Sequence, residues 1–168
     1  HAGASFRDKS TTAFHMHIVG ECAENTYTDS LKNYVREHHL SQQITFHGRV
    51  SSKRLDQFYK EADLFMMLSQ PHGDHFEGFG LVFVEANARG VPVIGPDGSG
   101  CIDAIHDGVS GYAVDPQQSD KVAERMQWIL EGHRINPDHC RQWAKKHSID
   151  HMTAQIEHIY QHLLCAAS

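Results

Sequence analysis

Two glutamates frame a glycine-containing apolar stretch, EGFGLVFVE, at residues 77–85. A helix that begins near Gly80 leaves the amides of its first residues, Gly80, Leu81 and Val82, without intrahelical partners. These amides lie at the positive end of the helix dipole, where anions bind. Glu85 lies one turn further, about 5 Å along the axis, and its side chain leans back toward the N-terminus. A phosphate on the amides with a carboxylate one turn away fits a nucleotide, because a carboxylate can accept both hydroxyls of a ribose.

Two other interpretations of this stretch stay open on the residues alone. An amphipathic helix needs no ligand, and its carboxylates then simply face solvent. A carboxylate pair of the glycosidase kind is less favoured, because such carboxyls lie about 5–9.5 Å apart whereas eight residues of continuous helix span about 12 Å. In the nucleotide interpretation, Glu77 precedes the helix and meets the group that lies beyond the phosphates.

Histidine is unusually frequent, with 15 residues, and raises the question of a metal site. His15 and His17 alternate along one strand-like segment and therefore point to one face, while His72 and His75 flank the loop of Glu77. Zinc needs three or four convergent ligands in a fixed geometry, which a glycine-containing loop supplies poorly. We therefore expect no metal, and we keep His75 as a candidate for contact with a donor or an acceptor.

Composition restricts the class of protein. The chain has 168 residues, of which 40% are apolar and 21% charged, as in an ordinary globular domain. A formal charge of −6 argues against a nucleic-acid surface, which needs a basic stripe. No apolar run approaches the ~20 residues of a membrane span, and the amino end has no signal-peptide core. Four scattered cysteines without a CxxC pair indicate free thiols, so we expect a cytoplasmic protein.

Apolar segments of two periods alternate along the chain. Strand-like segments occupy residues 14–20, 43–50, 63–69, 91–96 and 110–116. Segments with helical spacing lie between them and fill the chain after residue 116, and we expect Met66, Met67 and Trp128 to be in the core. Strands that alternate with helices predict an α/β fold with a mostly parallel sheet covered on both faces. Ligands of such sheets bind beyond the carboxyl ends of the strands, where three glycine-containing loops gather here.

Several motifs in the right order resemble the glycosyl transferases group 1 family of retaining, GT-B-type enzymes. EGFGLVFVEANARGVPVIG resembles the E-x7-E segment of that family, and GPDGSGCIDAIHDGVSGYAVDP resembles its next glycine-rich run. HIVGEC and ITFHGRVSSKRLDQFYKEADLFMMLS are similar to the second, third and fourth strands of its C-terminal domain. The loop QPHGDHFEGFG is similar to that of phosphatidylinositol-mannosyltransferase-like members. The resemblance covers about residues 14 to 165 and implies a Rossmann-like, three-layer α/β/α domain that binds a sugar nucleotide.

The resemblance also implies roles for particular residues. The residues implied to bind the donor are Glu77, Gly78, Phe79, Gly80, Leu81, Val82, Glu85, Arg49 and Val50. Glu77 is the candidate catalytic residue and contacts the donor sugar, and the amides of Leu81 and Val82 hold the diphosphate. Glu85 then binds the ribose, and the backbone at Arg49 and Val50 edges the base. Ser99, with Gly100 and Asp103, lies on a loop that faces the sugar in relatives, and no metal cofactor is implied.

One expected unit of the family's C-terminal domain is missing from these 168 residues. Its first strand and helix carry a Gly-Arg turn and a later Lys that neutralise the leaving diphosphate, and that strand would be central in a 3-2-1-4-5-6 sheet. Three explanations are a fragment, which we favour, a sheet that closes without the strand, and a strand supplied by another chain. We expect residues 1–13 to be an extension or an expression remnant, residues 14–147 the donor-binding domain, and residues 148–168 a helix that packs toward an absent N-terminal domain.

The resulting hypothesis is the donor half of a hexosyltransferase, inactive on its own. The absent domain would choose a glycan or lipid acceptor, and the parent protein would work in the cytoplasm or at the inner face of the membrane. The apolar stripe of the last helix is expected to favour homodimers in isolation. A nucleotide-sugar-binding module without catalysis is the alternative, and a sugar-nucleotide epimerase is disfavoured. The base, the sugar and the acceptor are not encoded in any motif of the chain.

Overall fold

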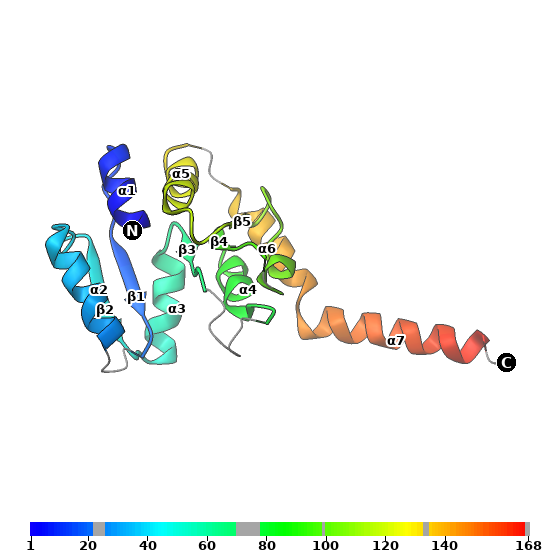
Figure 1. Cartoon of the computed structure of the whole chain (residues 1–168). Coiled ribbons are helices and arrows are strands. Elements are labelled where there is room, and N and C mark those ends of the chain that lie inside the picture. The colour runs from blue at the N-terminus through cyan, green and yellow to red at the C-terminus, as the bar shows by residue number, and fades with distance from the viewer. Residues whose placement is uncertain (22–25, 70–77, 99, 133–134, 167–168) are drawn as a thin grey trace.

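Strands and helices alternate along the chain, as the sequence predicts. A computed structural model describes residues 1–21, 26–69, 78–98, 100–132 and 135–166 (Figure 1). The helices are α1 (Ala2–Lys9), α2 (Thr26–Glu37), α3 (Ser52–Glu61), α4 (Leu81–Ala88), α5 (Ser119–Leu130), α6 (Pro137–Lys146) and α7 (Ile149–Ala166), with a short 3-10 helix, η1 (Gly100–Ala104). The strands are β1 (Met16–Val19), β2 (Ile44–Gly48), β3 (Phe65–Met66), β4 (Val93–Pro96) and β5 (Gly111–Val114).

Local sequence signals set the ends of several helices. The Ser51 side chain caps α3 by accepting a hydrogen bond from the Arg54 amide at 3.3 Å, as expected for a serine in this position. Asn136 caps α6 in the same way, with Pro137 at the first helical position. Gly90 follows α4 with a φ of 82°, the left-handed conformation that ends many helices. These helix boundaries therefore follow from the identity of single residues.

Helices cover both faces of the three-stranded sheet, in which β4 lies between β3 and β5 and all pairs are parallel. Adjacent residues of a strand point to opposite faces. Val93 packs with Phe83 of α4 in one buried cluster, and Ile94 packs with Val122 of α5 in another. The fold is thus the expected α/β class, Rossmann-like, with α4 and α5 on opposite sides of a parallel sheet.

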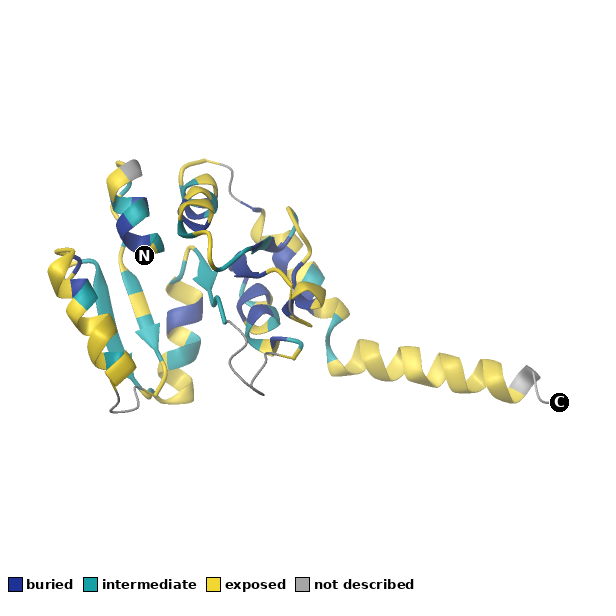
Figure 2. Cartoon of the chain, in the orientation of Figure 1, coloured by how far each residue is buried: buried dark blue, intermediate teal, exposed yellow. Residues whose placement is uncertain are grey.

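The sheet is divided where the missing strand was expected. In the described residues β1 pairs in parallel with β2, while β3, β4 and β5 form a separate sheet, so β1 and β3 are not paired. Of the three explanations for the missing strand, a sheet that closes without it does not fit the described residues. Burial reflects the division, because β4 is buried throughout whereas most residues of β1 and both residues of β3 are only half-buried (Figure 2).

Part of the stretch that we expected to be an extension belongs to the folded body. Residues Ala2–Lys9 form α1, which packs beside α5. The Phe6 side chain is fully buried and meets the Phe14 ring edge-to-face, with the ring centroids 5.2 Å apart. Burial of a phenylalanine side chain is worth about 1.5–3 kcal/mol, so Phe6 contributes to the attachment of α1 to the folded body, together with the packed side chains of Ala2 and Ala4.

The last helix, α7, projects away from the rest of the chain (Figure 1). Figure 2 shows it exposed along its length. The large apolar side chains exposed on it are Ile149, Met152, Ile156, Ile159, Tyr160, Leu163 and Leu164. Within the described ranges, no helix combines the length and the apolar character needed to cross a membrane. The docking of α7 on another domain, or on a second copy, stays a prediction.

The described core residues agree in part with those expected. Met66 and Met67 are half-buried and pack against the two main clusters. Trp128 is 43% exposed, so its expected place in the core is wrong: α5 buries a face formed by Val122, Met126 and Ile129 instead. Cys101 and Cys140 are both buried, and burial raises the pKa of the Cys140 thiol to about 11.

Candidate functional site

The site begins at the turn into α4. Gly80 precedes the helix in the left-handed conformation, with φ 77° and ψ 55°. A Cβ atom at this position would lie 2.7 Å from Cδ2 of Phe83, which is fully buried, so only glycine fits. Among the described residues, no side-chain hydrogen bond caps this end of α4. The amides of Leu81 and Val82 belong to its first turn, at the positive end of the helix dipole, and their binding of an anion stays a prediction.

Two glycine-containing loops meet beside this turn. A Cβ atom on Gly100 would lie 2.0 Å from the carbonyl oxygen of Gly78, so the two backbones are in direct contact. Gly78 follows the loop after β3, and Gly100 opens η1 after β4. Two of the three expected loops, those after β3 and β4, therefore meet at the carboxyl ends of neighbouring parallel strands, whereas the loop after β1 belongs to the other sheet. Asp103 of η1 is exposed.

Glu85 lies one turn along α4 and is exposed, on the same side as Leu81. Both residues line a shallow hollow between α4 and α6, whereas the side chain of Val82 packs toward the core. The Tyr59 hydroxyl of α3 lies 3.4 Å from Oε2 of Glu85. Burial, followed by the charge of Glu85, raises the pKa of Tyr59 to about 12.

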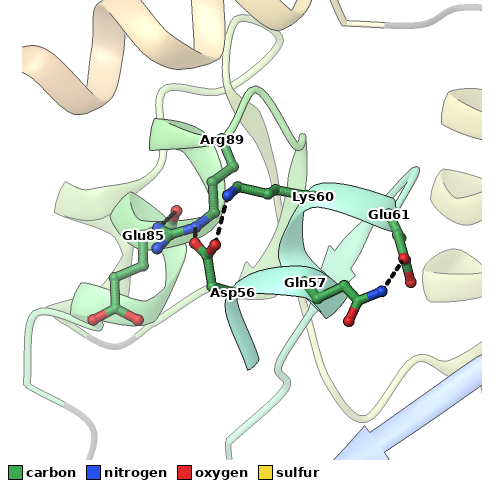
Figure 3. A network of polar contacts seen from close by, with 6 residues as sticks. All are labelled: Asp56, Gln57, Lys60, Glu61, Glu85 and Arg89. Atoms are coloured by element: carbon green, nitrogen blue, oxygen red, sulfur yellow. Dashed lines mark hydrogen bonds and ion pairs between the residues drawn. The ribbon is translucent and has the colours of Figure 1, made fainter. Parts of the chain in front are cut away.

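An ion-pair network joins α4 to α3 next to Glu85 (Figure 3). Arg89 donates from Nε to Oδ1 of Asp56 at 2.8 Å and from Nη1 to the carbonyl oxygen of Glu85 at 2.8 Å. Lys60 Nζ lies 2.6 Å from the other oxygen of Asp56. The hydrogen bond from Lys60, followed by that from Arg89, lowers the pKa of Asp56. The carboxylate of Glu85 points away from this network in Figure 3.

The structure brings some of the predicted residues together and separates others. Gly78, Phe79, Gly80, Leu81, Val82 and Glu85 form one continuous turn and helix. Arg49 and Val50 lie on a different loop, between β2 and the cap of α3, where Arg49 is exposed and Val50 is half-buried. Glu77, His75 and Ser99 lie outside the described residues. Tyr59 was not predicted, because its position on the apolar face of α3 indicates only a core residue.

Three histidines form a cluster on the two-stranded sheet. His15 and His17 face the same side, as predicted, with ring centroids 4.6 Å apart. Nδ1 of His17 lies 2.9 Å from Nε2 of His47 on β2. Desolvation, followed by the charges of its two histidine neighbours, lowers the pKa of His17. In the described part of the chain no group of three or more side chains is arranged to hold a metal ion, and His72 lies outside that part.

The sequence matches a known family. The sequence model of "Glycosyl transferases group 1" covers residues 1–147. The chain is 31% identical to the GDP-mannose-dependent alpha-(1-6)-phosphatidylinositol monomannoside mannosyltransferase of Mycobacterium tuberculosis, over 62% of this chain and 28% of the relative. It is 32% identical to the D-inositol 3-phosphate glycosyltransferase of Mycolicibacterium smegmatis, over 75% of this chain and 29% of the relative.

Solved structures share the fold over nearly the whole chain. HepE of Anabaena, crystallised with UDP-glucose, superposes with a TM-score of 0.75 at 21% identity, over 96% of this chain and 44% of HepE. The C-terminal domain of the group 1 glycosyl transferase LpcC from Francisella tularensis superposes with a TM-score of 0.74 at 23% identity, over 88% of this chain and 77% of that domain. These likenesses establish the GT-B type of fold.

The chain spans less than a third of the length of the curated relatives described above. The matched part includes the turn into α4, Glu85 and the loops after β3 and β4. The extent of the family match, residues 1–147 of 168, settles its classification. The chain belongs to the glycosyl transferases group 1 family.

Proposed function

We propose that this chain is the donor-binding part of a retaining glycosyltransferase that moves a hexose from a nucleotide-diphosphate sugar to a glycan or a lipid. One observation supports the proposal most directly: α4 begins at Gly80 and presents Glu85 one turn further along. The chain that carries this arrangement belongs to the glycosyl transferases group 1 family. Helix amides and a carboxylate in this order suit a diphosphate followed by a ribose. Relatives whose names include GDP-mannose and structures with UDP-glucose support a sugar nucleotide as the ligand.

Each predicted residue has a proposed role in this function. The amides of Leu81 and Val82 bind the diphosphate, and Glu85 accepts the ribose hydroxyls. Gly78, Phe79 and Gly80 shape the backbone so that the ligand can approach it closely. The backbone of Arg49 and Val50 lies beside the nucleotide base. Glu77 meets the donor sugar as the candidate catalytic residue, and His75 and Ser99 are the further candidates for contact with the sugar or the acceptor. The donor reacts by front-face displacement assisted by its leaving phosphate, without a metal cofactor, and the protein supplies orientation and electrostatic stabilisation.

The chain alone is proposed to bind the donor without transferring the sugar. The resemblance places the Gly-Arg turn and the lysine that would neutralise the leaving diphosphate on a strand-and-helix unit ahead of residue 14, and residues 1–13 contain no Gly-Arg pair. The pair Gly48-Arg49, with Lys53 after it, belongs to the loop that follows β2. Without that charge the transition state loses what is usually the largest catalytic contribution. The acceptor, the transfer step and a place in the cytoplasm or at the inner membrane face then belong to the longer parent protein. A module that binds sugar nucleotides without catalysis is the alternative, and a parent protein that carries the Gly-Arg turn and the lysine would favour the enzyme.

A calorimetric binding panel tests the proposal. UDP-glucose, GDP-mannose and ADP-glucose are titrated into the chain, and thermal unfolding is followed with each. Binding at 100-fold excess over Kd adds about 2.7 kcal/mol of stability, which raises Tm by about 5–10 °C for a chain of this length. We expect one of the three to bind and no sugar to be released or transferred. Absence of binding by all three at millimolar concentration would contradict the proposal.

A matched pair of variants locates the site. Glu85→Gln keeps the shape of the side chain but removes the charge that accepts the ribose hydroxyls, so donor binding should weaken about 10-fold. Glu124→Gln makes the same change on the exposed face of α5 and should leave the affinity unchanged. Equal affinities for the two variants would place the donor elsewhere on the chain.

A further inference from the structure

Tyr59 of α3 contacts the exposed carboxylate of Glu85 from the interior of the protein. The tyrosine is only 6% exposed, and its ring packs against Phe65 with centroids 5.5 Å apart. Its hydroxyl oxygen lies 3.4 Å from Oε2 of Glu85. Because the pKa of Tyr59 is raised to about 12, the phenol keeps its proton at neutral pH and acts as the donor. A rigid, buried group therefore holds one oxygen of a surface carboxylate.

Arg89 constrains the same region without neutralising Glu85. Its guanidinium lies 5.2 Å from the centre of the Tyr59 ring and donates to both the Glu85 carbonyl oxygen and Asp56. Figure 3 shows that Arg89 reaches across to α3, while the carboxylate of Glu85 points the other way. Glu85 lies four residues before Arg89 on α4, a spacing at which the two side chains could form an ion pair. Arg89 binds Asp56 of α3 instead. The negative charge of Glu85 stays available to a ligand.

We propose that Tyr59 is a positioning residue that orients Glu85 for the two hydroxyls of a ribose, an inference that rests on the proposed function. An ionised carboxylate has about four lone-pair sites. With one occupied by the phenol, the others can accept the vicinal 2′- and 3′-hydroxyls. An exposed glutamate otherwise samples several rotamers, and ordering such a side chain costs binding free energy. The hydrogen bond from Tyr59 restricts the Glu85 side chain before the ligand binds, so less free energy is lost when the ligand binds.

The ligand-dependent test compares two nucleotides in two variants. Tyr59→Phe retains the ring and its packing but removes the hydroxyl. For whichever nucleoside diphosphate the wild type binds, we expect affinity about 3- to 10-fold lower in Tyr59→Phe. Affinity for the 2′,3′-dideoxynucleoside diphosphate should be unchanged, because that ligand lacks both hydroxyls. Tyr112→Phe, which alters a tyrosine of β5 under Arg125, is the matched control and should bind both ligands like the wild type.

The outcomes separate this inference from the proposed function. An equal loss for both nucleotides would indicate a general structural defect and overturn the positioning role, as would an unchanged affinity for both. In the Glu85→Gln background the effect of Tyr59→Phe should disappear, and a persistent effect would also overturn it. Wild-type protein that binds no nucleoside diphosphate would contradict the proposed function instead.

A ligand-free measurement keeps the inference testable in that last case. Three-bond NMR couplings report the χ1 rotamer of Glu85. We expect the couplings of a single rotamer in the wild type and in Tyr112→Phe, and rotamer-averaged couplings in Tyr59→Phe. Identical couplings in all three proteins would show that the phenol does not orient the carboxylate.

Discussion

The side-chain amide of Asn87 on α4 donates a hydrogen bond of 3.0 Å to the carbonyl oxygen of Ser110, which directly precedes β5. The same nitrogen donates to the carbonyl oxygen of Val91 at 2.9 Å. Asn87 and Ser110 are both fully buried. One amide group therefore fixes the end of α4 against the starts of two neighbouring strands, and with it the helix that carries Glu85.

Replacing Asn87 should destabilise the whole domain. Asn87→Leu preserves the approximate volume but removes the side-chain donor from two buried carbonyl oxygens, of which that of Ser110 still accepts from the Val93 amide. We therefore expect a loss of about 1–3 kcal/mol of unfolding free energy. Urea denaturation followed by circular dichroism measures the loss. Gln57→Ala, on the exposed side of α3, is the control and should stay within about 0.5 kcal/mol of the wild type. Similar stabilities for the two variants would show that the Asn87 contacts contribute little.

Contact between Gly78 and Gly100 predicts a second sensitive position. Gly100→Ala places a methyl group against a backbone carbonyl that no side-chain rotation can move, and we expect a loss of about 1–3 kcal/mol. The amide NMR signals of Gly78 and Gly80 should shift as the turn is displaced. At Gly3, a Cβ atom has its nearest neighbour at 3.8 Å, so Gly3→Ala should be neutral or slightly stabilising. Unshifted Gly78 and Gly80 signals in Gly100→Ala would mean that the two loops are not in contact.

The divided sheet predicts an alternating pattern of hydrogen exchange. The amides of Phe65 and Met67 donate to carbonyl oxygens at β4, whereas that of Met66 points to the open side of β3. On β1, Met16 donates toward β2, and the amide of His17 points away. We expect fast exchange at Met66 and His17 and slow exchange at their neighbours, measured by NMR at single-residue resolution. Uniform protection along both strands would indicate that something pairs with the open edges.

The histidine cluster predicts lower stability in mild acid. The pKa of His17 is lowered on folding, so below its unfolded pKa of about 6.5 the unfolded chain binds more protons than the folded one. Stability contributed by neutral His17 is therefore complete above about pH 7 and decreases as the pH falls through 6.5. The charged groups around it are His15, His47 and Arg54, with Glu61 acting in the opposite direction.

Urea unfolding at a series of pH values measures this dependence. His17→Gln should flatten the curve between pH 7 and about 5, because the variant has no group to titrate at that position. His139→Gln, at an exposed position of α6, should reproduce the wild-type curve. A His17→Gln curve that keeps the full wild-type slope would assign the pH dependence to other groups, such as His147, whose pKa burial also lowers.

Much of the fold could be predicted because its signals are local. Alternating apolar segments located all five strands, although β3 is only Phe65–Met66 within the expected residues 63–69. Glycines at 80 and 90 predicted the start and end of α4, since their backbone conformations are costly for other residues. Helix geometry predicted that the first amides of α4 lie at its positive end with Glu85 one turn further, whereas their assignment to a sugar nucleotide needed the family resemblance.

Features that depend on distant partners could not be predicted. The residues AGASFRDK have one large apolar side chain, so nothing local shows that Phe6 is buried against α5. The contact between Tyr59 and Glu85 joins residues 26 positions apart, and it arises only when α3 and α4 pack side by side. Trp128 lies on α5 next to the apolar residues Ile129 and Leu130, and its exposure depends on which face of that helix the sheet covers.

Because α7 is long and attached to the folded body at one end, a small rotation at its base produces a large displacement at its tip. With 18 residues, α7 extends about 27 Å, so a turn of about 10° at its base carries the far end through about 5 Å. The base is in contact with the candidate site, because the His147 ring just before α7 packs between Trp143, at 4.7 Å, and Phe79, at 5.3 Å. Phe79 directly precedes Gly80. The turn into α4 and the base of α7 thus share one aromatic contact, and we expect a ligand that shifts this turn to move the tip of α7 by several ångströms.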